Sequence, residues 1–411
     1  MVLIYRILTI LLWPFVNVFS LFVSALREFL RIRKNDLKRI LSAPNPSQDT
    51  KVVWLHAASV GELDQCRALA KVFRQKEPKT LLLQSVTSSS VRDSQLEAFD
   101  ADIKFRLPMD FPWSYNAIFI KFRPEILVLM SWDRWPNLLL AARKFGTRSY
   151  LSSAVPPSQK GWLGRKMDRS VFALFTQIFP AHASSEQEFK NLLGAKARLK
   201  TLGDCRIDTV VQKVESNTKE FSRPNSYPFS KILVLASTYE PCESLLLPLI
   251  QDDNFKDFAF WIFPHKTSPD RIQFIESKVT SLGKVSSRYT SLPFEKQNSR
   301  IIVFDVLGLL AFAYKSADFA YVGGGLHNRV HNVLEPAYFG LPILTGPKID
   351  HSSEAKELKR TGGLFTIRSL EDAKKVLLLN EVELKRISRT NRAFLESGRG
   401  AGERTYLELR K

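Results

Sequence analysis

Residues 53–62 read Val-Trp-Leu-His-Ala-Ala-Ser-Val-Gly-Glu. The apolar start of this stretch predicts a buried strand, and the small residues after it predict a tight turn into a helix. Glu62 lies near the start of that helix, where free backbone N–H groups point outward. Ser59 and Gly61 add little bulk, so a substrate can approach the backbone here. The position is suited to a catalytic base, and we expect Glu62 to be one.

The alternation of apolar runs with amphipathic stretches continues along the chain and predicts two α/β units. The expected strands are residues 52–56, 81–86, 126–130 and 149–153, then 232–236, 258–263, 301–304, 319–322 and 342–344, with a helix at 63–74. Their Val, Leu and Ile are continuous rather than alternating, which is typical of parallel sheets covered on both faces. We expect an anchor and basic flank at 1–40, a first unit at 41–221, a proline-containing linker at 222–228, and a second unit at 229–411 whose last helix returns to the first.

Composition narrows the function classes. The chain has 411 residues, with 60 Lys and Arg against 41 Asp and Glu, and a net charge of +19. This charge favours an anionic partner, such as nucleic acid, phospholipid headgroups or phosphorylated substrates. Cys66, Cys205 and Cys242 have no paired spacing, which argues against a disulfide framework or a structural zinc site. A reducing, cytoplasmic compartment fits best.

The N-terminus favours a membrane as that partner. No residue from Ile7 to Leu26 is charged, and about 20 mainly apolar residues suffice for a helix to cross a bilayer. A basic cluster follows, which the positive-inside rule keeps in the cytoplasm: Arg27, Arg31, Arg33, Lys34, Lys38 and Arg39. Polar residues within the run leave open a helix that lies in the interface, and a buried hydrophobic helix is the alternative. A cleaved signal peptide is disfavoured because the run lacks a clear small-residue cleavage site.

A second candidate site follows the expected strand at 319–322. Gly323, Gly324 and Gly325 come next, and consecutive glycines let the backbone turn tightly and present N–H groups to a phosphate. His331, Asn332 and Glu335 follow, and on a helix the last two would share a face and reach a ribose. A simple turn with a helix cap is the alternative.

Three further segments have two interpretations each. Ser237, Thr238 and Glu240 follow a strand and form either a capping box or a phosphate contact. His265 and Lys266 end another strand, where they neutralise a leaving group or form a solvated surface pair. His327 and His331 have the spacing of a zinc helix, but Asn328 stands where a metalloprotease has its glutamate, so no metal is expected.

These segments, taken together and in order, resemble a known family. Beside residues 53–62 the resemblance rests on Trp135-Pro136-Asn137, on Gly203-Asp204 with Arg206 and Asp208, on Ser237-Thr238-Tyr239-Glu240, on Val322-Gly323-Gly324, and on His331-Asn332-Val333-Leu334-Glu335-Pro336. The family is that of the 3-deoxy-D-manno-octulosonic acid (Kdo) transferases of lipopolysaccharide assembly. The resemblance implies an α/β fold of the GT-B type, with two Rossmann-like domains facing a cleft, CMP-Kdo as donor, and a lipid A precursor as acceptor at the cytoplasmic face of the inner membrane.

The resemblance also implies roles for single residues. Glu62 matches the catalytic base of an inverting transfer that needs neither cofactor nor metal. The acceptor side would comprise Ser59, Gly61 and Trp135. The donor side would comprise Ser237, Thr238, Glu240, His265, Lys266, Gly323, Gly324, Gly325, His331, Asn332 and Glu335.

Four segments depart from the family's usual pattern. Residues 131–134 read Ser-Trp-Asp-Arg in place of Glu-Thr-Glu-Leu, so Ser131 replaces one carboxylate and Asp133 shortens the other. Ala154 replaces an arginine, Leu309 replaces a glutamate, and Pro-His-Lys at 264–266 replaces Pro-Arg-His. The alternatives to Kdo transfer are therefore another GT-B nucleotide-sugar enzyme, and a pseudoenzyme that binds lipid without turnover. Nucleic-acid binding is not expected, because the basic cluster adjoins an apolar anchor and no recognised motif is present.

Overall fold

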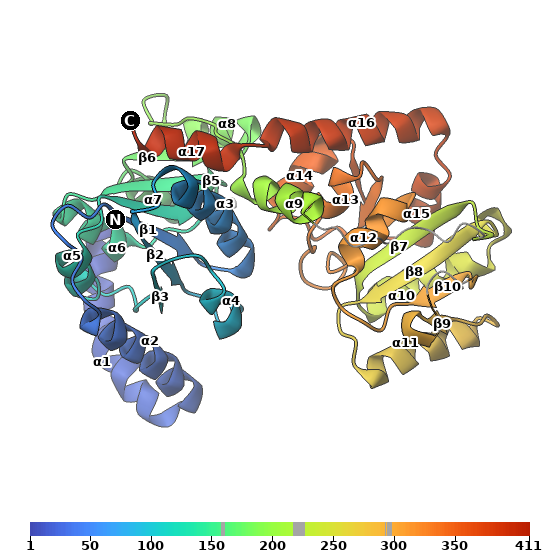
Figure 1. The fold of residues 1–411 in the computed structure, drawn as a ribbon, viewed down its shortest axis with the longest axis horizontal. Helices are drawn as coiled ribbons and strands as arrows, with labels where there is room; N and C mark the ends of the chain where they lie inside the picture. The colour runs from blue at the N-terminus through green and yellow to red at the C-terminus, as the bar shows by residue number, and fades with distance from the viewer. Residues whose placement is uncertain (158–160, 217–226, 292, 294–297) are drawn as a thin grey trace. The chain divides into compact units, whose positions relative to one another are not determined.

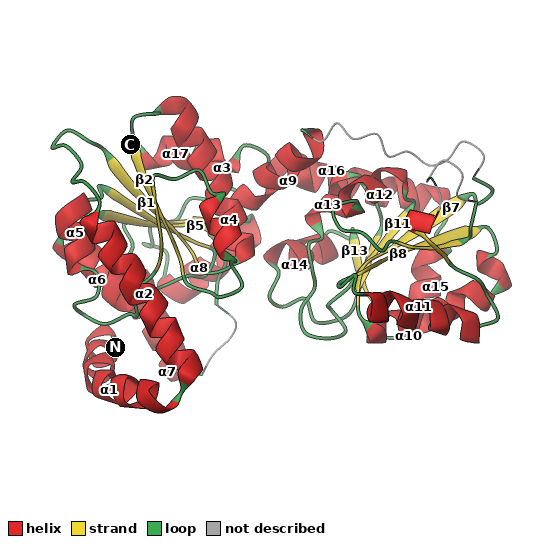
Figure 2. Ribbon diagram, turned by 60° about the horizontal axis from the view of Figure 1, so that its bottom comes forward, coloured by secondary structure: helices red, strands yellow, loops and turns green. Residues whose placement is uncertain are grey.

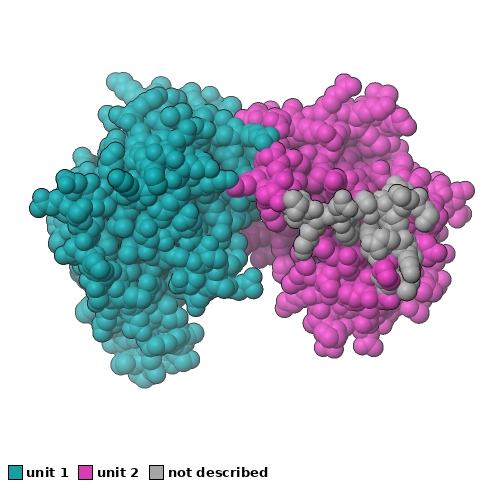
Figure 3. Space-filling model, viewed as in Figure 1, with its two compact units in different colours: residues 1–209, 398–411 teal, residues 210–397 magenta. Residues whose placement is uncertain are grey.

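The computed structural model describes residues 1–157, 161–216, 227–291, 293 and 298–411. Contacts within the chain divide it into two compact units, coloured separately in Figure 3. Unit 1 comprises Met1–Thr209 and Gly398–Lys411, and unit 2 comprises Val210–Ser397. Most of the predicted linker, 222–226, lies outside the described residues, so its role stays a prediction.

Unit 1 is built on a six-stranded parallel sheet in the order β3-β2-β1-β4-β5-β6 (Figure 1). Its strands are β1 (Val52–Ala57), β2 (Leu81–Val86), β3 (Ile103–Arg106), β4 (Ile126–Met130), β5 (Arg148–Ala154) and β6 (Gln177–Pro180). Its helices are α1 (Val2–Phe22), α2 (Ser24–Ser42), α3 (Val60–Lys76), α4 (Asp93–Glu97), α5 (Asn116–Phe122), α6 (Pro136–Lys144), α7 (Trp162–Phe172), α8 (Ala183–Leu193), the start of α9 (Cys205–Glu215), and α17 (Ala401–Leu409).

Unit 2 repeats this plan with a seven-stranded parallel sheet in the order β13-β12-β11-β7-β8-β10-β9. Its strands are β7 (Lys231–Thr238), β8 (Phe258–Pro264), β9 (Ser287–Arg288), β10 (Ile301–Val303), β11 (Phe319–Val322), β12 (Ile343–Thr345) and β13 (Leu364–Thr366). Its α-helices are the end of α9, α10 (Glu240–Leu246), α11 (Pro269–Ser281), α12 (Leu310–Ser316), α13 (Leu334–Tyr338), α14 (Ser353–Arg360), α15 (Leu370–Leu377) and α16 (Glu381–Gly398). Short 3-10 turns lie at Leu247–Gln251, Asp253–Phe255 and Tyr289–Ser291.

Both sheets are covered by helices on their two faces, as Figure 2 shows. Successive residues of β1 therefore enter different cores: Trp54 belongs to one cluster, and Val53 and Leu55 belong to another. All of β1 and β4 is buried. This explains why the central strands have continuous apolar sequences, and it confirms the predicted fold class of two parallel α/β units.

Every central strand was predicted, and the four strands that the sequence analysis missed are the sheet edges. β3 and β6 flank the first sheet, and β9 and β13 flank the second. These strands are only two to four residues long. Edge strands are commonly short and polar because such edges resist pairing with other chains. They therefore lack the apolar run on which the predictions depended.

The N-terminal helix α1 packs against unit 1 at its start. The Tyr5 hydroxyl donates to Asp110 Oδ2 at 3.0 Å, and Asn137 Nδ2 donates to Thr9 Oγ1 at 3.2 Å. The remainder of α1 is largely exposed, and it alone among the described helices is long and apolar enough to cross a bilayer. Val23, in extended conformation, then separates α1 from the basic helix α2.

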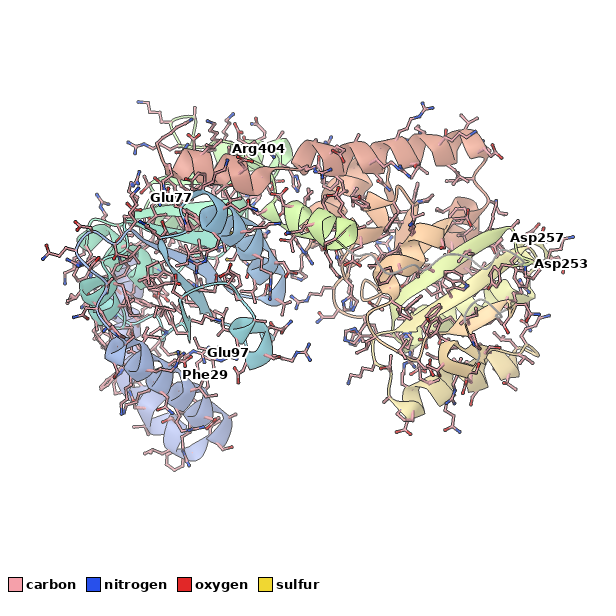
Figure 4. The ribbon with its side chains drawn as sticks, in the orientation of Figure 1. Phe29, Glu77, Glu97, Asp253, Asp257 and Arg404 are labelled. Carbon is pink, nitrogen blue, oxygen red and sulfur yellow. The ribbon has the colours of Figure 1, made fainter. Side chains whose placement is uncertain are left out.

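The C-terminal helix α17 packs on α3 by an ionic cluster within unit 1. Figure 4 labels Glu77, which follows α3, and Arg404 on α17. The Tyr406 hydroxyl donates to Glu77 Oε1 at 2.9 Å, and Arg410 Nη2 donates to Glu77 Oε2 at 2.7 Å. These contacts place the C-terminal residues of the chain beside the helix that carries Glu62.

Candidate active site

Glu62 lies in the first turn of α3, directly after the carboxyl end of β1. Its side chain is buried, with 4% of the residue exposed. Neither carboxylate oxygen makes a hydrogen bond of normal geometry with the described part of the chain. Ser59 is the N-cap residue of α3, but its side chain makes no capping bond. Glu62 therefore does not serve as the acidic partner of a capping box.

Burial and, to a smaller extent, the negative charge of Asp133 raise the pKa of Glu62 to about 8. The Ser59 hydroxyl and the nearby Ser59 and Ala58 amides oppose this shift only in part. Burial thus outweighs the helix N-terminus, which by itself would favour the carboxylate form. A carboxylate of this pKa is a far stronger base than an exposed glutamate, as proton abstraction near neutral pH requires.

Asp133 and His56 form the second part of this site. Asp133 follows the carboxyl end of β4, and His56 lies near the end of β1, the neighbouring strand. Asp133 Oδ2 lies 2.8 Å from His56 Nε2, and both side chains are buried. The predicted acceptor-side residue Trp135 donates from Nε1 to His56 Nε2 at 3.2 Å. The same ring nitrogen therefore accepts from Trp135 and lies close to Asp133 Oδ2, which has no hydrogen-bond partner of normal geometry among the described residues.

A series of hydrogen bonds joins Ser131, Gln65 and Asp204 beside Glu62. Ser131 Oγ donates to Gln65 Oε1 at 2.9 Å, and Gln65 Nε2 donates to Asp204 Oδ1 at 2.8 Å. The Arg206 amide also donates to Asp204. The Arg206 guanidinium lies over Gly61, 3.5 Å from where a Cβ would be. A Cβ at Gly61 would thus make an ordinary van der Waals contact with this arginine.

Ser131 and Ser153 have left-handed backbone conformations at or next to strand ends, with φ of 57° and 50°. Such conformations are uncommon for residues other than glycine and gather at functional sites. In unit 2, Ser237 near the end of β7 has the same feature, with φ of 49°. Three strained serines therefore lie near the carboxyl ends of strands, where ligands bind in open parallel sheets.

Site roles for His56, Gln65 and Asp133 were not predicted from the sequence. A signal for two of them was present: His56 is a polar residue inside an otherwise apolar strand, and Asp133 follows a strand end. Gln65 had no such signal, because it lies one helical turn from Glu62 among ordinary helix residues. Its role becomes visible only through its bonds to Ser131 and Asp204.

The second candidate site gathers flat rings at the carboxyl ends of β7, β8 and β11, which are adjacent strands. Tyr239 stacks on His265 with ring centroids 4.8 Å apart, and His265 stacks on His331 at the same separation. His327 lies 5.2 Å from Tyr239. His331 Nε2 lies 3.2 Å from the Tyr239 hydroxyl. We call these four residues the ring cluster.

Burial and, to a smaller extent, His265 and Arg329 lower the pKa of His331 to about 4. Burial also lowers the pKa of His265, aided by Lys266. His331 is therefore neutral near pH 7, and its ring faces its neighbours as an aromatic surface rather than as a cation. Lys266 and Arg329 are exposed beside the ring cluster and provide positive charge there.

The Gly323–Gly325 segment is packed against backbone on both sides. A Cβ at Gly323 would lie 2.1 Å from Ser237 O, and one at Gly324 would lie 2.2 Å from Arg329 O. Gly324 also has φ of 91°. The Gly323 amide donates to Ala236 O, and the Gly324 carbonyl accepts from the His327 and Asn328 amides. Close backbone packing thus explains these glycines, whether or not a phosphate binds.

The prediction that Ser237 begins a capping box is wrong. Ser237 does not cap a helix, because it lies inside β7, and α10 has Tyr239 as its N-cap residue with no side-chain bond. Instead Thr238 Oγ1 donates to Glu243 Oε1 at 2.7 Å, and Arg271 pairs with the same carboxylate. Glu240 is exposed and lies 3.6 Å from Lys278 Nζ.

Asn332 and Glu335 do not share a helix face, because α13 begins only at Leu334. Asn332 Oδ1 instead accepts from the Leu334 amide at 3.0 Å and so fixes the start of that five-residue helix. Glu335 is buried and pairs with Lys213 Nζ at 2.6 Å. A helix does follow the glycines, as expected, but residues 323–333 form turns, bends and irregular backbone before it begins.

Comparisons with known proteins support the resemblance. The family model described as 3-deoxy-D-manno-octulosonic-acid transferase (kdotransferase) matches residues 34–209, which lie in unit 1. The 3-deoxy-D-manno-octulosonic acid transferase of Chlamydia muridarum is 23% identical, covering 88% of this chain and 86% of that protein. The Rickettsia felis protein of the same name is 26% identical, covering 84% and 76%.

Solved structures share the two-unit fold. A UDP complex of MnaA from S. aureus matches with a TM-score of 0.60 at 18% identity, covering 88% of this chain and 98% of that chain. MurG from Acinetobacter baumannii matches with a TM-score of 0.55 at 15% identity, covering 88% and 99%. The family model on unit 1 and the curated relatives aligned along most of the chain support the Kdo transferase family, and the fold is of the GT-B type.

Proposed function

We propose that the protein is an inverting transferase that moves Kdo from CMP-Kdo to a lipid A precursor at the cytoplasmic face of the inner membrane. The observation that carries this proposal is Glu62: a buried carboxylate, at the carboxyl end of a parallel strand, with no hydrogen-bond partner of normal geometry among the described residues and a pKa raised to about 8. An unpaired buried carboxylate is unfavourable in a purely structural role. It is suited to accepting a proton from a substrate hydroxyl.

In the proposed reaction, the acceptor hydroxyl oxygen attacks the anomeric carbon of Kdo as Glu62 takes the hydroxyl proton. The bond from that carbon to the phosphate oxygen breaks, and CMP leaves with the electron pair. Attack on the face opposite the leaving group inverts the configuration. The proton then passes from Glu62 to solvent. Because the pKa of Glu62 is about 8, its carboxylate form, which accepts the proton, becomes the major form as the pH rises through that value.

On the donor side, the ring cluster offers the nucleotide base a stacking surface, and stacking on an aromatic ring contributes about 1–3 kcal/mol. Lys266 and Arg329 lie beside the rings and would face the phosphate and the Kdo carboxylate. Two further groups of donor-side residues stabilise the backbone at this edge of the sheet. Thr238 does so by its hydrogen bond to Glu243, and the glycines do so by allowing close backbone packing. Fixed cations of this kind can stabilise a departing phosphate without a metal, and we propose that this protein uses none.

On the membrane side, α1 would lie in the interface rather than span the bilayer. Tyr5 and Thr9 bind Asp110 and Asn137 of unit 1, and Trp13 packs on Trp113. A spanning helix would carry these polar partners into the hydrocarbon core, which is strongly unfavourable. The exposed apolar residues of α1 would then enter one leaflet, while Arg27, Arg31 and Lys34 of α2 face anionic headgroups. Arg33 is not available for lipid, because it is buried and donates to Thr87 O.

One assay tests the reaction. Purified protein is incubated with a CMP-Kdo generating system and a lipid A precursor, beside Glu62→Gln. We expect transfer by the wild type and its loss in the variant. CMP should raise the unfolding temperature of both proteins, since Glu62 is not on the donor side.

Other results of the same experiment would favour the alternatives. Thermal protection by UDP but not by CMP would support another GT-B nucleotide-sugar enzyme. Vesicle binding with no transfer by either protein would support a lipid-binding pseudoenzyme.

A vesicle experiment tests the interfacial helix. Phe15, Phe19 and Phe22 are 63–80% exposed on α1, and their joint replacement by serine should release the protein from vesicles that contain anionic lipid. A matched control replaces Val285, Leu307 and Val382, which are 75–85% exposed in unit 2, and should leave binding unchanged. Equal loss in both variants would contradict a role specific to α1.

A further inference from the structure

A buried carboxylate, Asp110, joins three segments of unit 1. It lies between β3 and α5 and is 7% exposed. Its Oδ1 accepts from the Tyr115 hydroxyl at 3.0 Å and from the Leu138 amide at 3.1 Å. Its Oδ2 accepts from the Tyr5 hydroxyl at 3.0 Å and from the Asn137 amide at 3.1 Å. Each oxygen thus binds one hydroxyl and one amide, and the donors come from α1, from the start of α5 and from the first turn of α6.

Asp110 supplies the cap that α6 lacks. The N-cap residue of α6 is Trp135, whose side chain makes no capping bond, and Pro136 follows it. The first amides of a helix have no partner within the helix, and a carboxylate satisfies them well because it also meets the positive end of the helix dipole. Proline has no amide hydrogen, so the first amides that need a partner are those of the second and third residues, which donate to Asp110. Asp110 therefore fixes the start of α6.

The start of α6 also carries a residue of the candidate active site. The Trp135 carbonyl accepts from the Leu139 amide at 2.9 Å, so the backbone of Trp135 belongs to the first turn of the helix. Its indole Nε1 donates to His56 Nε2 at 3.2 Å. A displacement of this turn would therefore move the indole relative to His56.

The helix α1 binds the same two residues of unit 1 through both of its hydroxyls on one face. Tyr5 and Thr9 lie one helical turn apart. Tyr5 donates to Asp110, as described, and Thr9 Oγ1 accepts from Asn137 Nδ2 at 3.2 Å. Asn137 Nδ2 also donates to Asp110 O at 2.6 Å. A helix that served only to enter lipid would not need these polar contacts, which end at the first turn of α6.

We propose that Asp110 is a positioning residue that joins α1 to Trp135, so that docking of α1 on unit 1 sets the affinity of the site for its lipid acceptor. This inference rests on the proposed function, because Trp135 is an acceptor-side residue only in a transferase of that kind. Asp110 and Tyr5 act through Trp135 and do not contact the reacting groups. The helix that meets the membrane would thereby also order the part of the site that receives a substrate from the membrane.

The first experiment requires no activity. The protein is labelled with fluorotryptophan and studied by fluorine NMR, and the Trp135 resonance is assigned by its loss in Trp135→Phe. Tyr5→Phe, which removes only the hydroxyl on α1, and Asp110→Asn should each displace this resonance. Tyr406→Phe is the matched control, because the Tyr406 hydroxyl on α17 also donates to a carboxylate of unit 1, Glu77 Oε1, at 2.9 Å. It should leave the Trp135 resonance unchanged.

The second experiment measures transfer. Tyr5→Phe should raise the KM for the lipid A precursor by about 5-fold or more, as expected for coupling between sites. Its kcat and its KM for CMP-Kdo should stay within about two-fold of wild type, because the ground state and the transition state lose the same acceptor contacts. Vesicle binding should be unchanged, since the exposed apolar residues of α1 remain. In the Asp110→Asn background, Tyr5→Phe should have little further effect, because both residues act through one carboxylate.

An unchanged Trp135 resonance in Tyr5→Phe would overturn the inference, as would an equal displacement in Tyr406→Phe. It would also be overturned if the acceptor KM rose only in proportion to lost vesicle binding, or if the effects of Tyr5→Phe and Asp110→Asn were additive. If Asp110→Asn does not fold, Tyr5→Phe decides the question, because it leaves the carboxylate in place. Absence of Kdo transfer by the wild type would contradict the proposed function, whereas the fluorine spectra would still show whether α1 controls Trp135.

Discussion

The two candidate sites lie at equivalent edges of two similar sheets, yet they consist of different kinds of residue. In unit 1 the strand ends carry buried carboxylates and an imidazole, with three carboxylate oxygens left without hydrogen bonds of normal geometry among the described residues. In unit 2 the strand ends carry closely packed glycines, stacked rings and exposed cations. Proton removal requires a desolvated base, whereas recognition of a charged nucleotide requires donors, cations and flat surfaces that remain accessible. Under the proposed function, the residues at the strand ends would thus adapt the same architecture to proton removal in unit 1 and to nucleotide recognition in unit 2.

The largest effect, on the rate of transfer, is expected when the base is removed from unit 1. Glu62→Gln should lower transfer by at least about 100-fold, because a general base contributes about 10² to 10⁴. Its affinity for CMP should stay within a factor of about two, since uniform binding is not affected. Initial rates and isothermal titration with CMP measure the two quantities.

The stability of Glu62→Gln tests whether Glu62 is a buried carboxylate without a partner. The native pKa of Glu62, about 8, exceeds the usual value of 4.5, so between these values the folded state binds a proton that the unfolded state has lost. Folding stability from this group therefore falls as pH rises from about 4.5 to about 8. Glu62→Gln should be the more stable protein at pH 9 and nearly equal to wild type at pH 4. A variant that is less stable at pH 9 would contradict burial of an unpaired charge.

The next largest effect is expected from a substitution that disturbs the backbone of unit 2. Gly324→Ala places a Cβ 2.2 Å from Arg329 O at a φ of 91°, and should lower the free energy of unfolding by more than about 2 kcal/mol, since strain of this kind costs about 1–3 kcal/mol before any clash. Gly283 has a φ of 68° with nothing within 4 Å of its added Cβ. Gly283→Ala should therefore be the milder change, at about 1 kcal/mol.

Urea unfolding of the two alanine variants makes this comparison. Equal destabilisation would mean that the positive φ alone, rather than the close backbone packing of the glycine segment, decides the effect. A loss of CMP binding by Gly324→Ala at full stability would show instead that the segment contacts the nucleotide directly.

A smaller effect concerns the ring cluster. Tyr239→Ala removes the ring that contacts all three histidines and should weaken CMP binding by about 5- to 100-fold, corresponding to about 1–3 kcal/mol of stacking. Phe274→Ala removes a half-buried aromatic residue from α11 and should leave CMP binding unchanged. Similar losses in both variants would indicate general destabilisation of unit 2 rather than a stacking surface.

The smallest effect is the pH dependence of unit 2. His331 has a native pKa near 4, below its usual 6.5, so the unfolded state binds a proton in this range that the folded state does not. Stability should therefore rise with pH from about 4 to about 6.5, and this part of the dependence should be missing in His331→Asn. Thermal unfolding of both proteins at pH 4.5 and 7 measures it. The sign is opposite to that of Glu62, which distinguishes the two sites in one experiment.

Much of the fold followed from sequence because its central strands are apolar throughout. Residues 81–86, 126–130 and 319–322 were predicted with the bounds that the structure shows. The edge strands were missed because short, partly polar strands have no comparable pattern. The predicted cap at Ser237 and the predicted helix face shared by Asn332 and Glu335 were wrong, because Ser237 lies inside β7 and α13 begins only after Asn332. Local signals cannot anticipate such packing.

The sequence by itself determined the two parallel sheets, the position of Glu62 at a strand end, and the glycines after β11, because each depends on residues adjacent in the chain. Only the tertiary structure decided that Glu62 is buried without a hydrogen-bond partner of normal geometry among the described residues, that His56 lies against Asp133, and that Tyr239 stacks with three histidines. These contacts join residues from separate strands. Burial and charge interactions depend on distance in space, and the amino-acid order fixes that distance only once the chain is folded.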